Sequence, residues 1–148
     1  MTKIVKTVLV PHSTKEMFEL VSDIENYSQY LPWCVKSEVI SEGNNIVVGA
    51  LYVEYLKIKT EFTTQNIHTP YSLIEISLIK GPFKTLHGKW EFISCKDLGC
   101  KINFCLEYQF ANKILEKCIG PVFDVITKNI LNCFIKEANK KLDNASST

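Results

Sequence analysis

The chain has 148 residues, of which 46% are hydrophobic and 22% charged, and 17 basic against 16 acidic residues give a formal net charge of +1. This composition is typical of a globular domain and excludes a disordered chain. The balanced charge gives no overall attraction to DNA, although it leaves a local basic patch open. No uninterrupted apolar run approaches the ~18 residues of a membrane span, and Ile4–Val10 is too short for a signal-peptide core. The sequence therefore predicts one cytoplasmic domain, residues 1–148, with its core from about residue 4 to 142.

The N-terminal segment combines a strand with a short helix. Ile4–Val10 reads as a strand that ends at Pro11. Ser13 followed by Glu16 matches a capping box, and the apolar residues after it predict a helix of about three turns. The aromatic connection Tyr27–Trp33 follows neither the helical nor the strand period, so it is predicted to be irregular.

The middle of the chain reads as consecutive strands joined by polar or glycine-containing turns. In the last strand, the apolar residues from Ile102 to Phe110 alternate with polar ones, so one face is expected to be buried. The predicted strands are Lys36–Ser41, Ile46–Leu56, Lys57–Ile67, Ser72–Lys80, Thr85–Ser94 and Lys101–Phe110.

The C-terminal segment carries one apolar stripe from Leu115 to Leu142, in steps of three and four residues that are typical of an amphipathic helix. Gly120-Pro121 interrupts this stripe, and proline fits a helix best at its first position. We therefore expect a short turn or helix up to Ile119 and a main helix from Pro121 to about Leu142, roughly 33 Å long. Asp143–Thr148 is expected to be a loose tail.

These elements together predict the fold class. Strands joined by hairpins build an antiparallel sheet that is apolar on one face, and a long sheet of this kind twists and curls. The C-terminal helix is the natural cover for that face. The prediction is α+β: a curved antiparallel sheet of about six or seven strands wrapped around a long C-terminal helix, with a short helix after the first strand. A curved sheet that grips a helix often leaves a cavity, which is the default ligand site.

The six cysteines form no Cys-x-x-Cys pair, and the three histidines stand at no zinc-like spacing to them, so no metal site is predicted. Cys95 and Cys100 flank the turn Lys96–Gly99 and could face each other across a hairpin. In a reducing compartment we expect reduced thiols rather than a disulfide.

Three segments resemble one known superfamily. They are Tyr30–Cys34 (YLPWC), Gly81–Phe92 (GPFKTLHGKWEF) and Leu106–Phe110 (LEYQF), and they stand in order within a match that runs from about Ile4 to Leu142. The chain resembles the START-related, helix-grip superfamily of polyketide cyclase and dehydrase-like domains. Within it, the chain is most similar to the branch of coenzyme Q-binding START-domain proteins and bacterial ribosome association toxins.

The resemblance implies two functions. One is a cavity for a ubiquinone-like lipid, without a further cofactor, in support of respiratory electron transfer. The other is binding to the large ribosomal subunit, which blocks subunit joining. No arginine-rich mitochondrial leader is present, so we expect a bacterial protein in the cytoplasm that can contact the inner membrane transiently.

Aromatic and aliphatic residues are the candidates for the lipid site. The loop that contains Trp33, together with Tyr27, Tyr30 and Leu31, could form the lip of a ligand tunnel, and it could equally pack over the end of the core. On the strand Thr85–Ser94, Gly88 could leave room for a ligand or for the helix. For Trp90, and for the stripe residues of the helix, core packing is the competing interpretation. The predicted ligand-binding residues are Phe18, Tyr30, Trp33, Phe83, Trp90, Phe123 and Ile126.

Catalysis is not predicted. His87 is a candidate general base, but by alternation it points away from Trp90, together with Lys89 and Glu91. The sequence has neither a nucleophile-elbow motif nor a glycine-rich phosphate loop. A cyclase or dehydratase of the wider superfamily would require an acid or base in the cavity, and the assigned inward faces are overwhelmingly apolar.

A set of lysines falls on neighbouring strands and turns. It could bind ribosomal RNA or anionic lipid headgroups, or it could belong to a surface of mixed charge. These residues are Lys57, Lys59, Lys80, Lys84 and Lys89.

Overall fold

The computed structural model describes residues 1–146, with side chains described as far as Leu142. Seven strands form one sheet in the order β1-β7-β6-β5-β4-β3-β2, and every neighbouring pair is antiparallel. The elements are β1 (Thr2–Val10), α1 (Thr14–Ser22), the 3-10 turn η1 (Ile24–Asn26), α2 (Tyr27–Tyr30), β2 (Cys34–Gly43), β3 (Ile46–Tyr55), β4 (Ile58–Thr69), β5 (Leu73–Lys80), β6 (Phe83–Ser94), η2 (Lys96–Leu98), β7 (Cys100–Phe110) and α3 (Lys113–Ser146).

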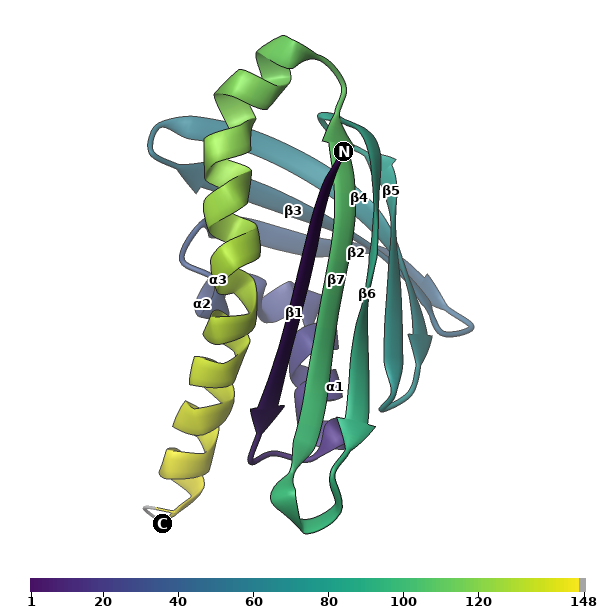
Figure 1. The fold of residues 1–148 in the computed structure, drawn as a ribbon, viewed down its shortest axis with the longest axis vertical. Helices are drawn as coiled ribbons and strands as arrows, with labels where there is room; N and C mark the ends of the chain where they lie inside the picture. Colours follow the sequence, from purple (N-terminus) through teal and green to yellow (C-terminus); the bar gives the residue numbers. More distant parts are fainter. Residues whose placement is uncertain (147–148) are drawn as a thin grey trace.

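The sheet curls around α3, which runs along its concave face (Figure 1). The α1 helix lies between the sheet and the C-terminal half of α3, at one end of the molecule (Figure 1). This arrangement confirms the predicted α+β fold, including the short helix after the first strand. The first strand, β1, pairs with β7 along its whole length, from Thr2 opposite Tyr108 to Val10 opposite Cys100.

The start of α1 is fixed by the predicted capping box. The Ser13 hydroxyl accepts a hydrogen bond from the Glu16 backbone N–H at 3.1 Å, and the Glu16 carboxylate accepts one from the Ser13 N–H at 3.3 Å. These two bonds satisfy donors that a helix start otherwise leaves open. Met17, Phe18 and Leu20 then bury the inner face of α1.

Two hairpin turns use pairs of residues in the left-handed conformation. Asn44 and Asn45, with φ of 52° and 62°, join β2 to β3, and asparagine tolerates this conformation well. Leu56 and Lys57, with φ of 50° and 69°, join β3 to β4. Leucine is poorly suited to left-handed backbone, so the second turn is a strained one.

The prediction that Gly120-Pro121 separates two helical segments is wrong. The α3 helix is continuous over 34 residues with Pro121 inside it, which makes it about 51 Å long. Proline removes one backbone hydrogen bond and costs ~3 kcal/mol in a helix interior. Burial of Ile119 and Val122 on either side of Pro121, at about 1.5–3 kcal/mol for each side chain, offsets this cost. The first turns of α3 run at an angle to the rest of the helix (Figure 1), as a proline kink would produce.

Two smaller boundaries also differ from the prediction. The connection Tyr27–Trp33 is not wholly irregular, because Tyr27–Tyr30 forms one helical turn closed by the bond from the Leu31 N–H to the Tyr27 carbonyl at 2.8 Å. The predicted loose tail begins too early, because α3 continues to Ser146, and residues 147–148 lie outside the described residues.

Strand alternation places the core as predicted. Ile102, Phe104 and Leu106 of β7 are buried on the concave face, and Lys101 and Asn103, which alternate with them, face outward. The predicted hairpin around Lys96–Gly99 also forms, but Cys95 and Cys100 are free thiols. Burial raises the pKa of the Cys100 thiol to about 11, so this thiol stays protonated and unreactive at neutral pH.

By length and composition, the segment Lys113–Leu142 of α3 is apolar enough to cross a membrane, with a mean hydropathy of 1.3 over 18 residues. The core helix of a globular protein meets the same criterion. Here Phe123, Ile126 and Phe134 of that segment are buried against the sheet, so we assign α3 to the core.

Candidate functional site

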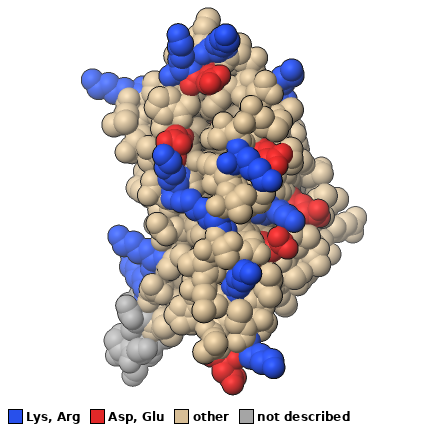
Figure 2. Space-filling model, viewed as in Figure 1, with Lys and Arg blue, Asp and Glu red and all other residues tan. Residues whose placement is uncertain are grey.

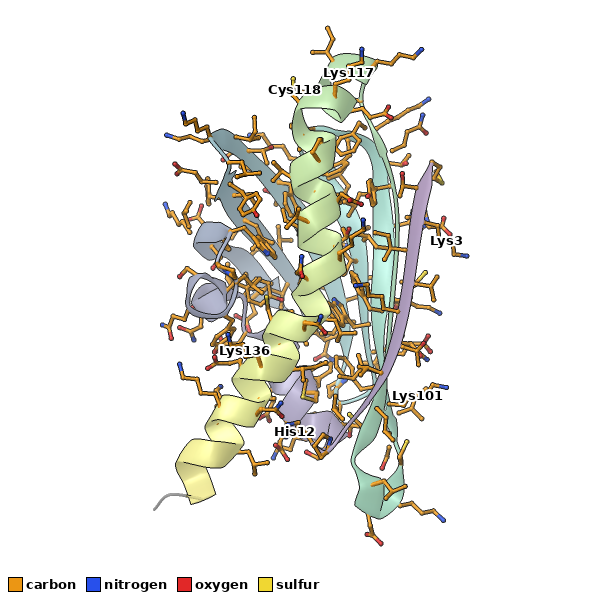
Figure 3. All side chains as sticks on the ribbon, turned by 60° about the vertical axis from the view of Figure 1, so that its left-hand side comes forward. Lys3, His12, Lys101, Lys117, Cys118 and Lys136 are labelled. Atoms are coloured by element: carbon orange, nitrogen blue, oxygen red, sulfur yellow. The ribbon has the colours of Figure 1, made fainter. Side chains whose placement is uncertain are left out.

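A cavity of about 90 Å³ lies between the concave face of the sheet and the middle of α3. Strands β3 to β7 form its floor, α3 forms its roof, and the segment from η1 to the start of β2 closes one side. Side chains fill most of the space between the sheet and the helix (Figure 3). The cavity is therefore a small opening inside a packed core.

Aromatic rings make up much of the lining. Trp90 stacks on Phe104 with ring centroids 4.2 Å apart, and Phe123 of α3 meets Phe62 of β4 edge to face at 6.0 Å. Trp33 is 2% exposed and lines the side formed by the start of β2. The surface that these rings present is flat, rigid and apolar, which suits a planar or chain-like apolar ligand.

Four of the seven predicted ligand-binding residues come together at this cavity: Trp33, Trp90, Phe123 and Ile126. The other three lie elsewhere. Phe83 is one layer behind, with its ring 4.9 Å from that of Phe123. Phe18 packs beside His68 and Phe92 near the β4–β5 turn.

Tyr30 is the third residue that the structure keeps away from the cavity. Its hydroxyl donates a hydrogen bond to the Asp23 carboxylate at 3.0 Å, which ties α2 to the end of α1. Burial, together with this bond to Asp23, raises the pKa of Tyr30 to about 12. The part of the predicted aromatic lip that reaches the cavity is Trp33 together with Tyr27, whose hydroxyl donates to the Val21 carbonyl.

The sequence prediction missed three polar lining residues: Thr64, Asn66 and Thr127. The Asn66 amide donates to the Val47 carbonyl and to the Thr64 hydroxyl, both at 3.2 Å. Thr64 and Asn66 stand two and four residues after Phe62, so strand alternation places them on the same inner face. This pair of polar residues on a buried strand face is the sequence pattern that could have predicted them as lining residues. Such pairs are the few polar groups with which an apolar pocket orients its ligand.

Trp33 also carries an unused donor. Its indole Nε1 is buried and has no hydrogen-bond partner among the described residues. A buried donor without a partner costs about 1–3 kcal/mol, and nearly all such groups in proteins find one. A ligand oxygen in the cavity is a natural partner for this group.

The lining contains no carboxylate, imidazole, amine or thiol in the described part of the chain. Its one ionisable group is the Tyr27 phenol, and burial raises the pKa of this phenol far above neutral. His87 lies on the outer face of the sheet, 3.2 Å from Glu107, as the alternation predicts. The cavity can therefore hold and orient a ligand, but it presents no group that titrates near pH 7.

Gly88 serves the sheet and not the ligand. A Cβ at this position would stand 2.3 Å from the Cys105 carbonyl oxygen and 2.8 Å from the Leu106 side chain, both on β7. Neither predicted alternative describes this glycine, because its close neighbour is the strand β7 and not a ligand or the helix.

The five lysines proposed as a basic patch are all exposed. Lys89 pairs with Glu91 at 3.4 Å, so its charge is partly balanced. On the face shown in Figure 2, lysines stand among acidic side chains instead of forming one continuous patch. That face has the mixed charge of the competing interpretation.

A curved seven-stranded sheet that grips a long helix over an internal apolar cavity defines a START-like ligand-binding domain. Residues 10–135 match the family described as polyketide cyclase / dehydrase and lipid transport, and the chain belongs to this family. The resemblance found in the sequence is thereby confirmed.

Two relatives and one solved structure locate the chain within the superfamily. It is 36% identical to the ribosome association toxin RatA of Vibrio cholerae, over 95% of this chain and 97% of that protein. It is 28% identical to the mitochondrial coenzyme Q-binding protein COQ10 of Drosophila melanogaster, over 92% of this chain and 58% of that protein. The crystal structure of the Zhui aromatase/cyclase from Streptomyces sp. R1128 has the same fold, with a TM-score of 0.79, 16% identity and 95% of each chain covered.

Proposed function

We propose that this protein binds a ubiquinone-like lipid in the cavity under α3, without catalysis, and so supports respiratory electron transport. The observation that carries the proposal is the cavity itself, which is apolar and has in its wall the Trp33 indole N–H, without a hydrogen-bond partner in the described part of the chain. A quinone offers carbonyl and ether oxygens to such a donor, and its isoprenoid tail gains about 25 cal/mol per Å² of buried surface. The coenzyme Q-binding relative supports this class of ligand.

Binding requires the cavity to widen. A volume of about 90 Å³ is the share of about three water molecules in the liquid, which is less than a quinone ring needs. Leu51 and Ile130 are the half-exposed aliphatic residues of the lining on β3 and α3. We place the opening between them, because both side chains already contact solvent.

The absence of catalysis is part of the proposal. Cyclisation and dehydration both need a group that takes or gives a proton. The described lining offers hydroxyls and one amide, and its single phenol is held protonated. Such a cavity protects and presents a ligand. We place this activity in the bacterial cytoplasm, with transient visits to the inner membrane.

Organic extraction of the natively purified protein, followed by mass spectrometry, tests the proposal. We expect a stoichiometric quinone from the wild type. Ile126→Phe should lose it by filling the cavity, while the matched variant Val125→Phe, which adds the same ring at the neighbouring half-exposed position of α3, should keep it. Phe123→Asp should also lose it, together with much of the stability. An empty extract from folded wild-type protein, or an unchanged quinone content in Ile126→Phe, would overturn the proposal.

A second candidate function is binding to the large ribosomal subunit, which blocks subunit joining. It is favoured by 36% identity to a ribosome association toxin over nearly the full length of both chains. Lys57, Lys59 and Lys84 are exposed and would contact RNA phosphates.

Cosedimentation with purified large subunits at increasing salt tests this second function. Reversal of these three lysines to glutamate should abolish binding, and the matched reversal of Lys15, Lys96 and Lys101 should not. Sedimentation that is independent of salt and of the first reversal would remove this candidate.

A further inference from the structure

Two of the most exposed apolar side chains of the molecule lie on turns at the same end. Leu56 is 73% exposed in the β3–β4 turn, and Ile114 is 74% exposed in the first turn of α3. Both turns lie at the end of the molecule opposite the C-terminus (Figure 1). We call this end the docking surface and define it by Leu56 and Lys57 of the β3–β4 turn and by Lys113, Ile114, Lys117 and Cys118 of α3.

The apolar side chains of α3 at this end form a second stripe, separate from the one in the core. Ile114, Cys118 and Pro121 stand at steps of four and three residues, so they share one side of the helix, and all three are exposed. The core stripe in the same turns runs through Leu115, Ile119 and Val122. Cys118 points away from β1, toward the side on which the β3–β4 hairpin lies, and Lys117 projects from the tip (Figure 3). The first turns of α3 therefore have more apolar surface than the sheet covers.

The β3–β4 turn has a strained backbone at Leu56. Both of its central residues have positive φ, where asparagine or glycine would be favoured. The side chain at the tip of this turn is the solvent-exposed Leu56, and Lys57 follows it. The turn closes the β3–β4 hairpin, in which Tyr55 pairs with Ile58, but the hairpin itself does not require an exposed leucine at this position.

The charges around these apolar tips identify the partner. Lys57, Lys113 and Lys117 are exposed beside them, and Glu116 is the acidic residue within the first turns of α3. Positive side chains gather at this tip in Figure 2, with negative charge directly beside them. Aliphatic tips rimmed by lysines suit an acyl-chain boundary under anionic headgroups. All 17 basic residues of the chain are lysines, and the planar guanidinium that favours RNA recognition is absent from it.

We propose that the docking surface binds the surface of an anionic phospholipid bilayer, with Leu56 and Ile114 inserted below the headgroups and Lys57, Lys113 and Lys117 on the phosphates. The docking surface and the proposed lipid site share α3, because Phe123 and Ile126, two to three turns further along this helix, line the cavity. Docking would bring the roof of the cavity to the membrane from which a lipid is taken. The proposal does not depend on which lipid the cavity holds, since bilayer binding is measured without it.

Flotation with lipid vesicles tests the proposal. Wild-type protein should float with vesicles of phosphatidylglycerol and phosphatidylcholine and much less with phosphatidylcholine alone. The double variant Leu56→Asn/Ile114→Asn should bind the anionic vesicles at least about tenfold more weakly, and Lys113→Glu/Lys117→Glu should also weaken binding about tenfold. Leu98→Asn is the matched control, because Leu98 is 71% exposed at the opposite end, in the β6–β7 turn.

Thermal unfolding shows whether each variant is folded. All these positions are exposed, so we expect no melting temperature below that of the wild type, and the variant with Leu56→Asn should melt slightly higher because asparagine tolerates the left-handed backbone of this turn. Three outcomes would overturn the proposal: equal binding to both kinds of vesicle, unchanged flotation of the Leu56/Ile114 variant, or an equal loss in Leu98→Asn. A fourth is a variant that floats normally but no longer cosediments with large ribosomal subunits, which would assign this end to RNA.

Discussion

The two halves of the concave face contain the same kinds of side chain but pack them differently. Toward the end covered by α1, Met17, Leu31 and Phe134 have no exposed surface, and none of them lines the cavity. In the middle of the sheet, Trp90 and Phe123 are nearly as buried, yet they surround the cavity. The difference comes from α1, which fills the space between sheet and helix at one end only (Figure 1). The position of the cavity in this fold therefore depends on which element packs between the sheet and α3, and not on the number of aromatic side chains on the concave face.

The largest effect is expected where packing is complete. Phe134→Ala should lower the free energy of unfolding by about 3–5 kcal/mol, because the fully buried ring packs against Tyr27 and Trp90 and its removal leaves a cavity between them. Urea denaturation measures this change. A loss below about 1 kcal/mol would mean that this end is as loosely packed as the cavity.

At the cavity, a change of one donor should affect the ligand more than the fold. Trp33→Phe removes the buried indole N–H, which has no hydrogen-bond partner among the described residues. We therefore expect little loss of stability and a quinone affinity lower by about tenfold, the value of one hydrogen bond. Titration calorimetry measures the affinity and urea denaturation the stability. An unchanged affinity would show that Trp33 contributes to quinone binding only through its apolar ring surface.

A pH effect should separate the two halves further. Burial lowers the pKa of His68, whose Nε2 has no partner among the described residues and whose ring packs on Phe18 at the α1 end. The folded state therefore favours the neutral ring, so its contribution is present above the ordinary pKa of about 6.5 and is lost as the pH falls toward the lowered value. His68→Phe should flatten the decline in melting temperature between about pH 7 and 5. If the melting temperature of the variant had the same pH profile as that of the wild type, titration of other groups would cause the decline.

The smallest effect is expected on the convex face. The Glu107 carboxylate lies 3.2 Å from His87 Nε2 and 3.6 Å from the Lys3 ammonium, and the side chains of both partners are more than half exposed. Glu107→Gln should change the free energy of unfolding by less than about 0.5 kcal/mol. A change above 1 kcal/mol in urea denaturation would show that the outer ion pairs act as a network.

Local patterns predicted most of the fold, because each depends on residues a few positions apart. The alternation in β7 and the Ser13–Glu16 capping box identified a buried face and a helix start without any tertiary information. The Pro121 prediction failed for the opposite reason. Whether a helix continues through proline depends on the surface buried on both sides of it, and that surface belongs to strands far away in the sequence.

The site could be predicted only in part. Trp33 and Phe18 look equivalent as buried aromatic residues, and only the position of α1 assigns one to a cavity wall and the other to the filled end. A cavity is a place where atoms are missing, so it depends on the register of several elements at once. Asn66 was overlooked because a polar residue in a strand is usually exposed. Asn66 lies on the same face of β4 as Phe62, so it can be assigned to the inner face only once Phe62 is known to be buried.

The pairing of β1 with β7 also dictates when this protein can fold. Thr2 lies opposite Tyr108, so the first strand to leave the ribosome has its hydrogen-bonding partner among the last residues of the sheet to be synthesised. At synthesis rates of about 5–20 residues per second, β1 waits for seconds with its apolar side chains uncovered. Closure of so long a loop makes folding slow, because the entropy is lost before the contacts form. The α3 helix, made after β7, then completes the core in a single late step.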